Sequence, residues 1–188
     1  MKLLGRLSVV SLFFLGLSFG ASHGATIYYA RCNLKVLNGT EINWVNWQAA
    51  PTYIPVGTPL RVTIKGRNTA SLRDEKKDRE YVLDMGGKGE LYLSKFLTEK
   101  PVDFSNISGD VLANIKKGVA RNGMTKQEVY MAMGPPVKLP VGDTQKMGYE
   151  EIMKYDLWIY ARRRFSKQIG IAFDPETGRV NRTEGIWK

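Results

Sequence analysis

The chain has 188 residues and a formal net charge of +10, with 28 Lys and Arg residues against 18 Asp and Glu. This length suits one or two small domains. With one histidine and one cysteine, histidine-based catalytic triads and the usual zinc sites lack residues, and an internal disulfide is excluded. Carboxylate pairs such as Glu150-Glu151 and Asp74-Glu75 lie among basic or flexible neighbours and read as surface. We therefore expect a protein that is not an enzyme and that uses no cofactor or metal.

Residues 1–24 have the three parts of a secretory signal peptide. Lys2 and Arg6 give a positive start, an apolar stretch runs from Leu7 to Leu17, and small residues follow from Gly20 to Ala25. The apolar stretch is shorter than the roughly 20 residues that span a bilayer. We expect export and cleavage, with an uncleaved N-terminal anchor as the alternative. Cleavage after residue 24 removes both cations and the histidine, so the net charge falls from +10 to +8.

Residues 25–100 are predicted to form a β-rich N-terminal domain, either a small antiparallel sheet or a barrel. Several short strand patterns alternate there with turn signals. The clearest is the alternation of Leu60, Val62 and Ile64 with polar residues, which is typical of a half-buried strand. Asn38-Gly39 predicts a type I′ hairpin turn.

Two further segments of this region are predicted to be turns. The mixed charges from Arg73 to Glu80 are typical of a solvated hairpin tip. Gly86-Gly-Lys-Gly89 resembles a phosphate-binding loop, but the full pattern G-x-x-x-x-G-K-[ST] is missing, since Gly89 and then Glu90 follow the Gly-Lys pair. We therefore expect a glycine-rich hairpin turn between two strands.

From residue 101 to 188 the pattern changes to two helices followed by three strands. Ser108 or Asp110 can cap the first helix, which Gly118 ends. The three strands are predicted at about residues 155–164, 168–174 and 179–187. These elements define the second predicted domain.

The second helix lies within Gly123-Met124-Thr125 to Pro135-Pro136. Thr125 is a good N-cap, and Glu128 completes a capping box with it. Val129 lies on the apolar face, Gly134 is predicted to take the left-handed C′ position, and the two prolines prevent continuation.

This series, followed by Trp158-x-Tyr160 and a strand that ends in Phe173-Asp174, resembles the SmpA/OmlA (BamE-like) family over about residues 119–185. The resemblance implies an α+β domain in which two helices pack on one face of a three-stranded antiparallel sheet. It also implies a Gram-negative bacterium and a role in outer-membrane protein assembly or envelope integrity. Family members are often lipoproteins, but Cys32 follows Tyr29-Ala30-Arg31, well beyond the apolar stretch, so we expect no lipidation there. Cys32 is predicted to be a small buried residue, with a reactive thiol or an intermolecular disulfide as the alternative.

Candidate contact residues lie on the first of the three strands. Because side chains alternate along a strand, Trp158, Tyr160, Arg162 and Arg164 share one face. If the aliphatic face packs on the helices, these four side chains can contact acidic protein segments or anionic lipid headgroups. Alternatively, the two aromatic residues belong to the core and the arginines are solvated at the strand end.

The sequence thus predicts a non-catalytic binding module of the periplasm, attached peripherally to the outer membrane or free. Its expected partners are an envelope protein, such as a component of barrel assembly, and anionic lipid. Nucleic acid is not expected because the protein is predicted to be exported. The alternative function is a soluble periplasmic inhibitor or ligand-binding protein with the same fold.

Overall fold

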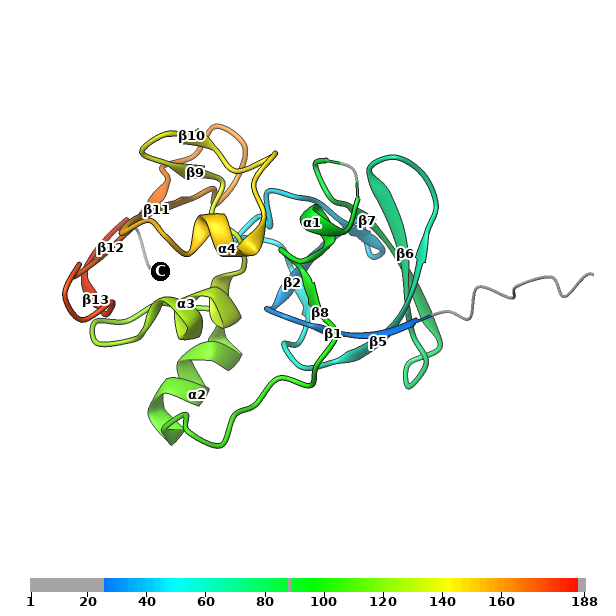
Figure 1. Cartoon of the computed structure of the whole chain (residues 1–188), viewed down its shortest axis with the longest axis horizontal. Helices are drawn as coiled ribbons and strands as arrows, with labels where there is room; N and C mark the ends of the chain where they lie inside the picture. Colours follow the sequence, from blue (N-terminus) through cyan, green and yellow to red (C-terminus); the bar gives the residue numbers. More distant parts are fainter. Residues whose placement is uncertain (1–25, 88, 186–188) are drawn as a thin grey trace, which may run out of the picture.

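The structure is a computed structural model that describes residues 26–87 and 89–185. The predicted signal peptide lies outside these residues. Within them the protein is mostly β: thirteen strands form two sheets, and the four helices are short (Figure 1).

The first sheet has eight strands and is strongly curled (Figure 1). Its order is β4-β2-β3-β7-β6-β5-β1-β8. All neighbours are antiparallel except β3 and β7, which run parallel, so the sheet is mixed rather than purely antiparallel as predicted. The strands are β1 (Thr26–Ala30), β2 (Leu34–Leu37), β3 (Glu41–Ile42), β4 (Thr52–Ile54), β5 (Pro59–Ile64), β6 (Thr69–Asp74), β7 (Arg79–Asp84) and β8 (Leu97–Thr98).

Two of the three predicted turns are confirmed, and the third prediction is wrong. Asn38 and Gly39 both have positive φ (46° and 84°), as a type I′ turn requires. The charge run forms the tip of the β6–β7 hairpin. The glycine-rich segment, however, joins β7 to a short helix, α1 (Glu90–Leu93), rather than to a strand. A run of four residues does not distinguish a strand from a single helical turn by periodicity.

The second sheet has five strands in the order β10-β9-β11-β12-β13, all antiparallel. Helices α2 and α3 pack against each other and lie beside this sheet (Figure 1). The elements are α2 (Gly109–Lys117), α3 (Lys126–Met133), β9 (Lys138–Leu139), β10 (Gly142–Asp143), α4 (Tyr149–Ile152), β11 (Leu157–Tyr160), β12 (Ile169–Phe173) and β13 (Val180–Glu184).

The predicted fold class, an α+β domain with two helices on three strands, is therefore wrong. Helices α2 and α3 and the last three strands occur where the pattern placed them. The segment between α3 and β11, for which no helix or strand was predicted, adds two strands and a helical turn. Lys138 pairs with Ile159 across the sheet, and Val137 N donates to Ile159 O at 2.8 Å. Strands of two residues are too short to leave a period-two pattern, so the sequence did not show them.

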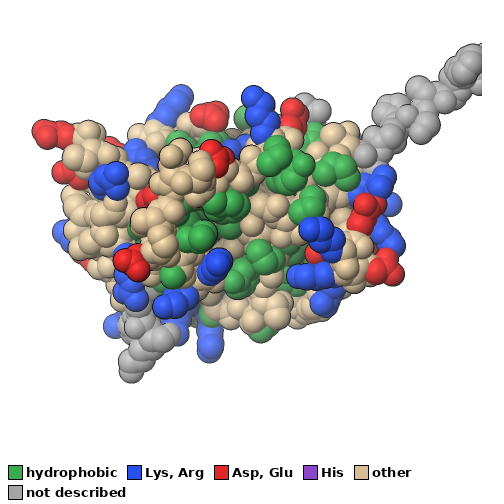
Figure 2. Space-filling model, turned by 90° about the horizontal axis from the view of Figure 1, so that it is seen from below, with side chains coloured by type: hydrophobic (Ala, Val, Ile, Leu, Met, Phe, Trp, Pro, Cys, Tyr) green, Lys and Arg blue, Asp and Glu red, His purple; other side chains and the backbone are tan. Residues whose placement is uncertain are grey.

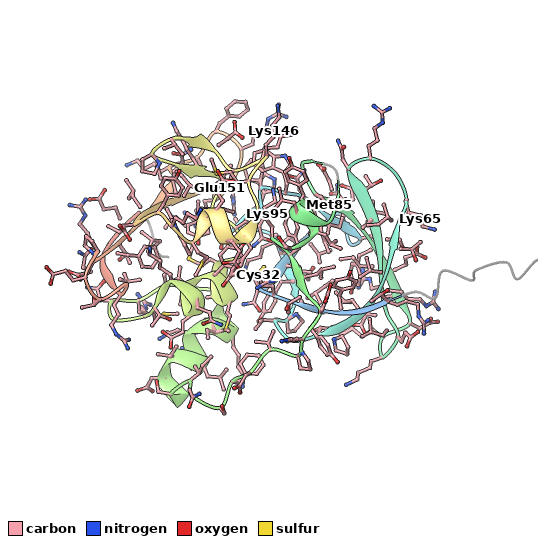
Figure 3. The ribbon with its side chains drawn as sticks, in the orientation of Figure 1. Cys32, Lys65, Met85, Lys95, Lys146 and Glu151 are labelled. Carbon is pink, nitrogen blue, oxygen red and sulfur yellow. The ribbon has the colours of Figure 1, made fainter. Side chains whose placement is uncertain are left out.

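The two sheets share one continuous hydrophobic core. In Figure 3, Cys32 and Lys95 lie in the middle of the molecule, between the curled sheet and the helical part. Seen from below (Figure 2), apolar side chains gather along the middle of the face, and charged side chains are most frequent towards its two ends. The predicted domain boundary at residue 100 falls between β8 and α2.

Buried polar side chains also form hydrogen bonds across the junction between the curled sheet and the rest of the protein, residues 101–185. The amide nitrogen of Asn33 donates to Ile115 O at 2.7 Å and to Ala132 O at 3.1 Å. The ammonium group of Lys95 donates to Thr144 O at 3.2 Å and to Gln145 O at 2.9 Å. These bonds satisfy main-chain oxygens that the packing of the two sheets removes from water.

Candidate functional site

Two of the four predicted contact residues belong to the core. Trp158 and Tyr160 are both 0% exposed. The Trp158 ring meets Tyr130 of α3 edge-on, with centroids 5.9 Å apart, and Tyr160 Oη donates to Gly134 O at 3.2 Å. The aromatic face of β11, rather than the aliphatic face, therefore packs on the helices, and Leu157 on the other face is 38% exposed.

The arginines occupy the loop between β11 and β12, which we call the arginine loop (residues 161–168). Arg163 and Arg164 are exposed, and Arg162 is half-buried. No ion pair of these three arginines is found among the described residues. The neighbouring Lys167 is exposed as well, so the loop is a concentrated and unneutralised positive surface.

The arginine loop has a defined conformation. Ser166 N donates to Arg163 O at 3.2 Å, and Arg163 N donates to Ser166 Oγ at 2.9 Å. At the tip, Phe165 has φ 59° and is 97% exposed. A bulky residue with positive φ is uncommon and marks a constrained turn. The loop thus presents one aromatic ring to solvent between cationic side chains.

A hollow of about 330 Å³ adjoins the arginines. We call it the arginine groove: one wall is Arg162–Arg164, and the other is apolar. Gln48 N donates to Ala161 O and Ala49 N to Arg162 O, both at 3.0 Å, so main-chain bonds hold the two walls together. The apolar wall consists of Leu37, Trp47, Ala49, Ala50 and Pro51.

The sequence did not indicate the apolar wall of this groove. Trp47 lies in an irregular segment between β3 and β4. More than a hundred residues separate it from the arginines. The one local signal is the short apolar run Ala49-Ala50-Pro51, which has no strand or helix period.

The residues of the Gly123–Pro136 motif are structural. The capping box is confirmed: Glu128 N donates to Thr125 Oγ1 at 3.3 Å, and Thr125 N donates to Glu128 Oε2 at 2.7 Å. Gly134 has φ 74° and ψ −159°, so its φ is positive but it is not in the predicted left-handed helical conformation. The remaining motif residues, Met124, Val129, Pro135 and Pro136, are buried, and Gly123 donates its N–H to Val180 O at 2.8 Å.

Burial alters the pKa values of Cys32 and Lys95. Burial raises the pKa of Cys32 to about 12, against the lowering effect of Arg31 and Lys35, so the thiol is protonated at neutral pH and inert as a nucleophile. The prediction of a small buried cysteine is confirmed. Burial lowers the pKa of Lys95 to about 8, although Asp84 and Asp143 oppose this shift.

Neither a cluster of three or more potential metal-ligating His, Cys, Asp or Glu residues nor a helix long and apolar enough to cross a bilayer occurs in the part of the chain that the structure describes.

Comparisons with protein-family models, with curated proteins and with solved structures gave no significant match. The resemblance to the SmpA/OmlA family thus stays a prediction based on the motif residues. The arginine groove, with three arginines beside an apolar wall, is the candidate functional site.

Proposed function

We propose that this protein is a non-catalytic binding module that holds an acidic segment of a partner protein in the arginine groove. The observation that carries the proposal is that one hollow is lined both by three arginines, which form no ion pair with the described residues, and by an apolar wall. Guanidinium groups bind carboxylates through two parallel hydrogen bonds, and Trp and Arg are the residue types most enriched at protein interfaces.

The shape of the groove favours a protein segment. A hollow of about 330 Å³ next to Trp47 can take an apolar side chain of the partner, while acidic residues on either side of that side chain meet Arg162 and Arg164. Trp158 and Tyr160 are buried, so neither is part of the surface that we propose for the partner. The predicted signal peptide and the family resemblance support the bacterial envelope as the place where such a partner is found.

A second candidate is an anionic lipid surface. The observation that favours it is Phe165, which projects almost fully exposed among basic side chains. Each basic residue close to an anionic membrane contributes about 1 kcal/mol, and an aromatic ring can enter the headgroup region.

The test is capture of partners from detergent-solubilised envelopes by the tagged protein, followed by mass spectrometry. The Arg162→Glu/Arg164→Glu variant reverses two charges in the groove. A matched control, Lys65→Glu/Arg67→Glu, makes the same charge change at exposed positions in the β5–β6 turn. We expect the wild type and the control to recover the same protein and the groove variant to lose it.

Equal recovery by all three proteins, or equal loss in both variants, would contradict a specific role for the groove. Sedimentation with phosphatidylglycerol vesicles and with neutral vesicles measures binding to a lipid surface. Binding to the anionic vesicles alone, with no protein recovered from envelopes, would replace the protein partner by the lipid surface.

A further inference from the structure

A second hollow lies away from the arginine groove, around Arg31 directly after β1. Two adjoining cavities of about 280 and 240 Å³ both include Arg31, Thr98 and Lys100 in their walls. The first extends along α1 and β8, and the second extends towards Tyr149 and α3. Arg31 therefore stands between two spaces, each large enough for a small organic molecule.

The guanidinium group of Arg31 is held in a fixed orientation. Its Nε donates to Ser94 O at 2.7 Å, and its central carbon lies 4.0 Å from the centroid of the Tyr149 ring. The Tyr149 ring in turn meets Tyr130 edge-on, at 4.9 Å and 88°. Tyr130 Oη donates to Lys95 O at 2.9 Å. This row of contacts, from half-buried Arg31 and Tyr149 to buried Tyr130, fixes the plane of the guanidinium before any ligand arrives.

Arg31 has no carboxylate partner at ion-pair distance within the described residues. It is half-buried, and a cation in such a position ordinarily finds a partner. The carboxylate of Asp103, in the wall of the second cavity, accepts a hydrogen bond from Ser105 N at 2.8 Å. The hollow therefore contains a preorganised cation without its own counter-ion.

The charges around the hollow indicate which anion fits. Arg31 and Lys100 give two positive charges, and Glu99 and Asp103 give two negative ones. This balance disfavours a doubly charged phosphate, because the acidic groups at the rim repel the second charge. A planar carboxylate with one charge matches the guanidinium fork.

We propose that this hollow is a binding site for the carboxylate of a small organic acid or of a peptide C-terminus, with Arg31 as its anchor. Lys100 supplies a second positive charge at the rim, and Gln127 supplies an amide for a neighbouring polar group. The site is independent of the proposed function, because it shares no residue with the arginine groove.

The test is an NMR titration of the purified protein that follows the side-chain Nε–Hε signal of Arg31. The probes are benzoate, a short acetylated peptide with a free C-terminus, the same peptide amidated, and inorganic phosphate. We expect saturable shifts of the Arg31 signal with benzoate or with the free-acid peptide, and none with the amidated peptide. A response to benzoate alone identifies a small acid, and tighter binding of the peptide identifies a chain terminus.

Two variants and a control complete the experiment. Arg31→Gln should weaken binding of the carboxylate probes about tenfold or more, because a charge-assisted pair is lost. Lys100→Met, at an exposed position, should weaken it less and tests the site if the first variant does not fold. Arg67→Gln, at an exposed position in the β5–β6 turn and outside both hollows, should leave it unchanged. The absence of any saturable shift, or phosphate binding as tight as that of the carboxylates, would overturn the proposal.

Discussion

The side-chain amide of Asn46 donates a 2.6 Å hydrogen bond to the main-chain oxygen of Met133, the last residue of α3. The same side chain accepts a bond from Lys35 N at 2.8 Å and donates a second to Asn33 O at 3.2 Å. Asn46 is 0% exposed and has φ 50°. One side chain therefore joins β2 of the curled sheet to the end of the helix that lies beside the second sheet.

Replacing this residue should be costly. Asn46→Ala leaves Lys35 N without its side-chain acceptor and removes one of the two side-chain bonds to Met133 O, the other coming from Gln48 Nε2 at 2.9 Å. We therefore expect the free energy of unfolding to fall by about 2–4 kcal/mol. Urea denaturation monitored by tryptophan fluorescence measures the loss. Asn106→Ala, at an exposed loop position, should stay within about 0.5 kcal/mol of the wild type. Equal stability of the two variants would show that the junction does not depend on Asn46.

Gly134 lies next to the side-chain amide of Asn46, and the packing there leaves no room for a Cβ atom. A Cβ atom there would lie 2.3 Å from Asn46 Nδ2 and 3.1 Å from Cys32 Sγ. We expect Gly134→Ala to destabilise the protein by about 2 kcal/mol or more, through the clash and the positive φ of 74°.

Gly109→Ala is the matched control for this substitution. Gly109 begins α2, and no atom lies within 4 Å of the Cβ position. The substitution should be neutral or raise stability by up to about 1 kcal/mol. Urea denaturation measures the free energy of unfolding of both variants. Equal effects of the two alanines would contradict the requirement for glycine at position 134.

Local signals predicted local structure well. The capping box at Thr125 and Glu128, the turn at Asn38-Gly39 and the stop at Gly118 are confirmed because each depends on residues within one or two turns of chain. The prediction of three strands alone in the second sheet is wrong. Two-residue strands such as β9 form because β11 lies beside them, and that is a tertiary cause.

The predicted contact residues on β11 also show that local sequence signals do not predict tertiary contacts. Alternation along β11 separated Trp158 and Tyr160 from the aliphatic residues, but it does not say which face meets the helices. Trp158 fits between Tyr130 and Phe173, and the larger rings bury more apolar surface there. The groove beside Arg162 joins segments more than a hundred residues apart, so it could not be found from the sequence.

Lys95 gives a prediction about pH. Its pKa is about 8 in the folded protein, below the ordinary value of 10.5. Between these values the unfolded chain holds the proton and the folded protein has lost it, so stability rises with pH. The penalty for the charged group is fully present below pH 8 and gone above pH 10.5. We expect the wild type to gain up to about 3 kcal/mol relative to Lys95→Met across this window.

Urea denaturation at pH 7, 8, 9 and 10 measures this difference. Burial also lowers the pKa of Lys35, so stability of the wild type alone does not isolate Lys95, and the comparison with Lys95→Met is needed. Lys117→Met, at the exposed end of α2, should run parallel to the wild type. A constant difference between wild type and Lys95→Met at all four pH values would contradict the lowered pKa.

Phe165 allows binding to be separated from stability. Its ring is 97% exposed, so Phe165→Gly loses almost no burial. Relief of the positive φ and the greater freedom of glycine in the unfolded chain offset each other to within about 0.5 kcal/mol. If the arginine loop contacts the partner, capture from envelopes should nevertheless fall about tenfold. Ile64→Thr removes an exposed apolar side chain from β5 and should leave capture unchanged. Full capture by Phe165→Gly would confine the interface to the groove, with the loop tip free in solution.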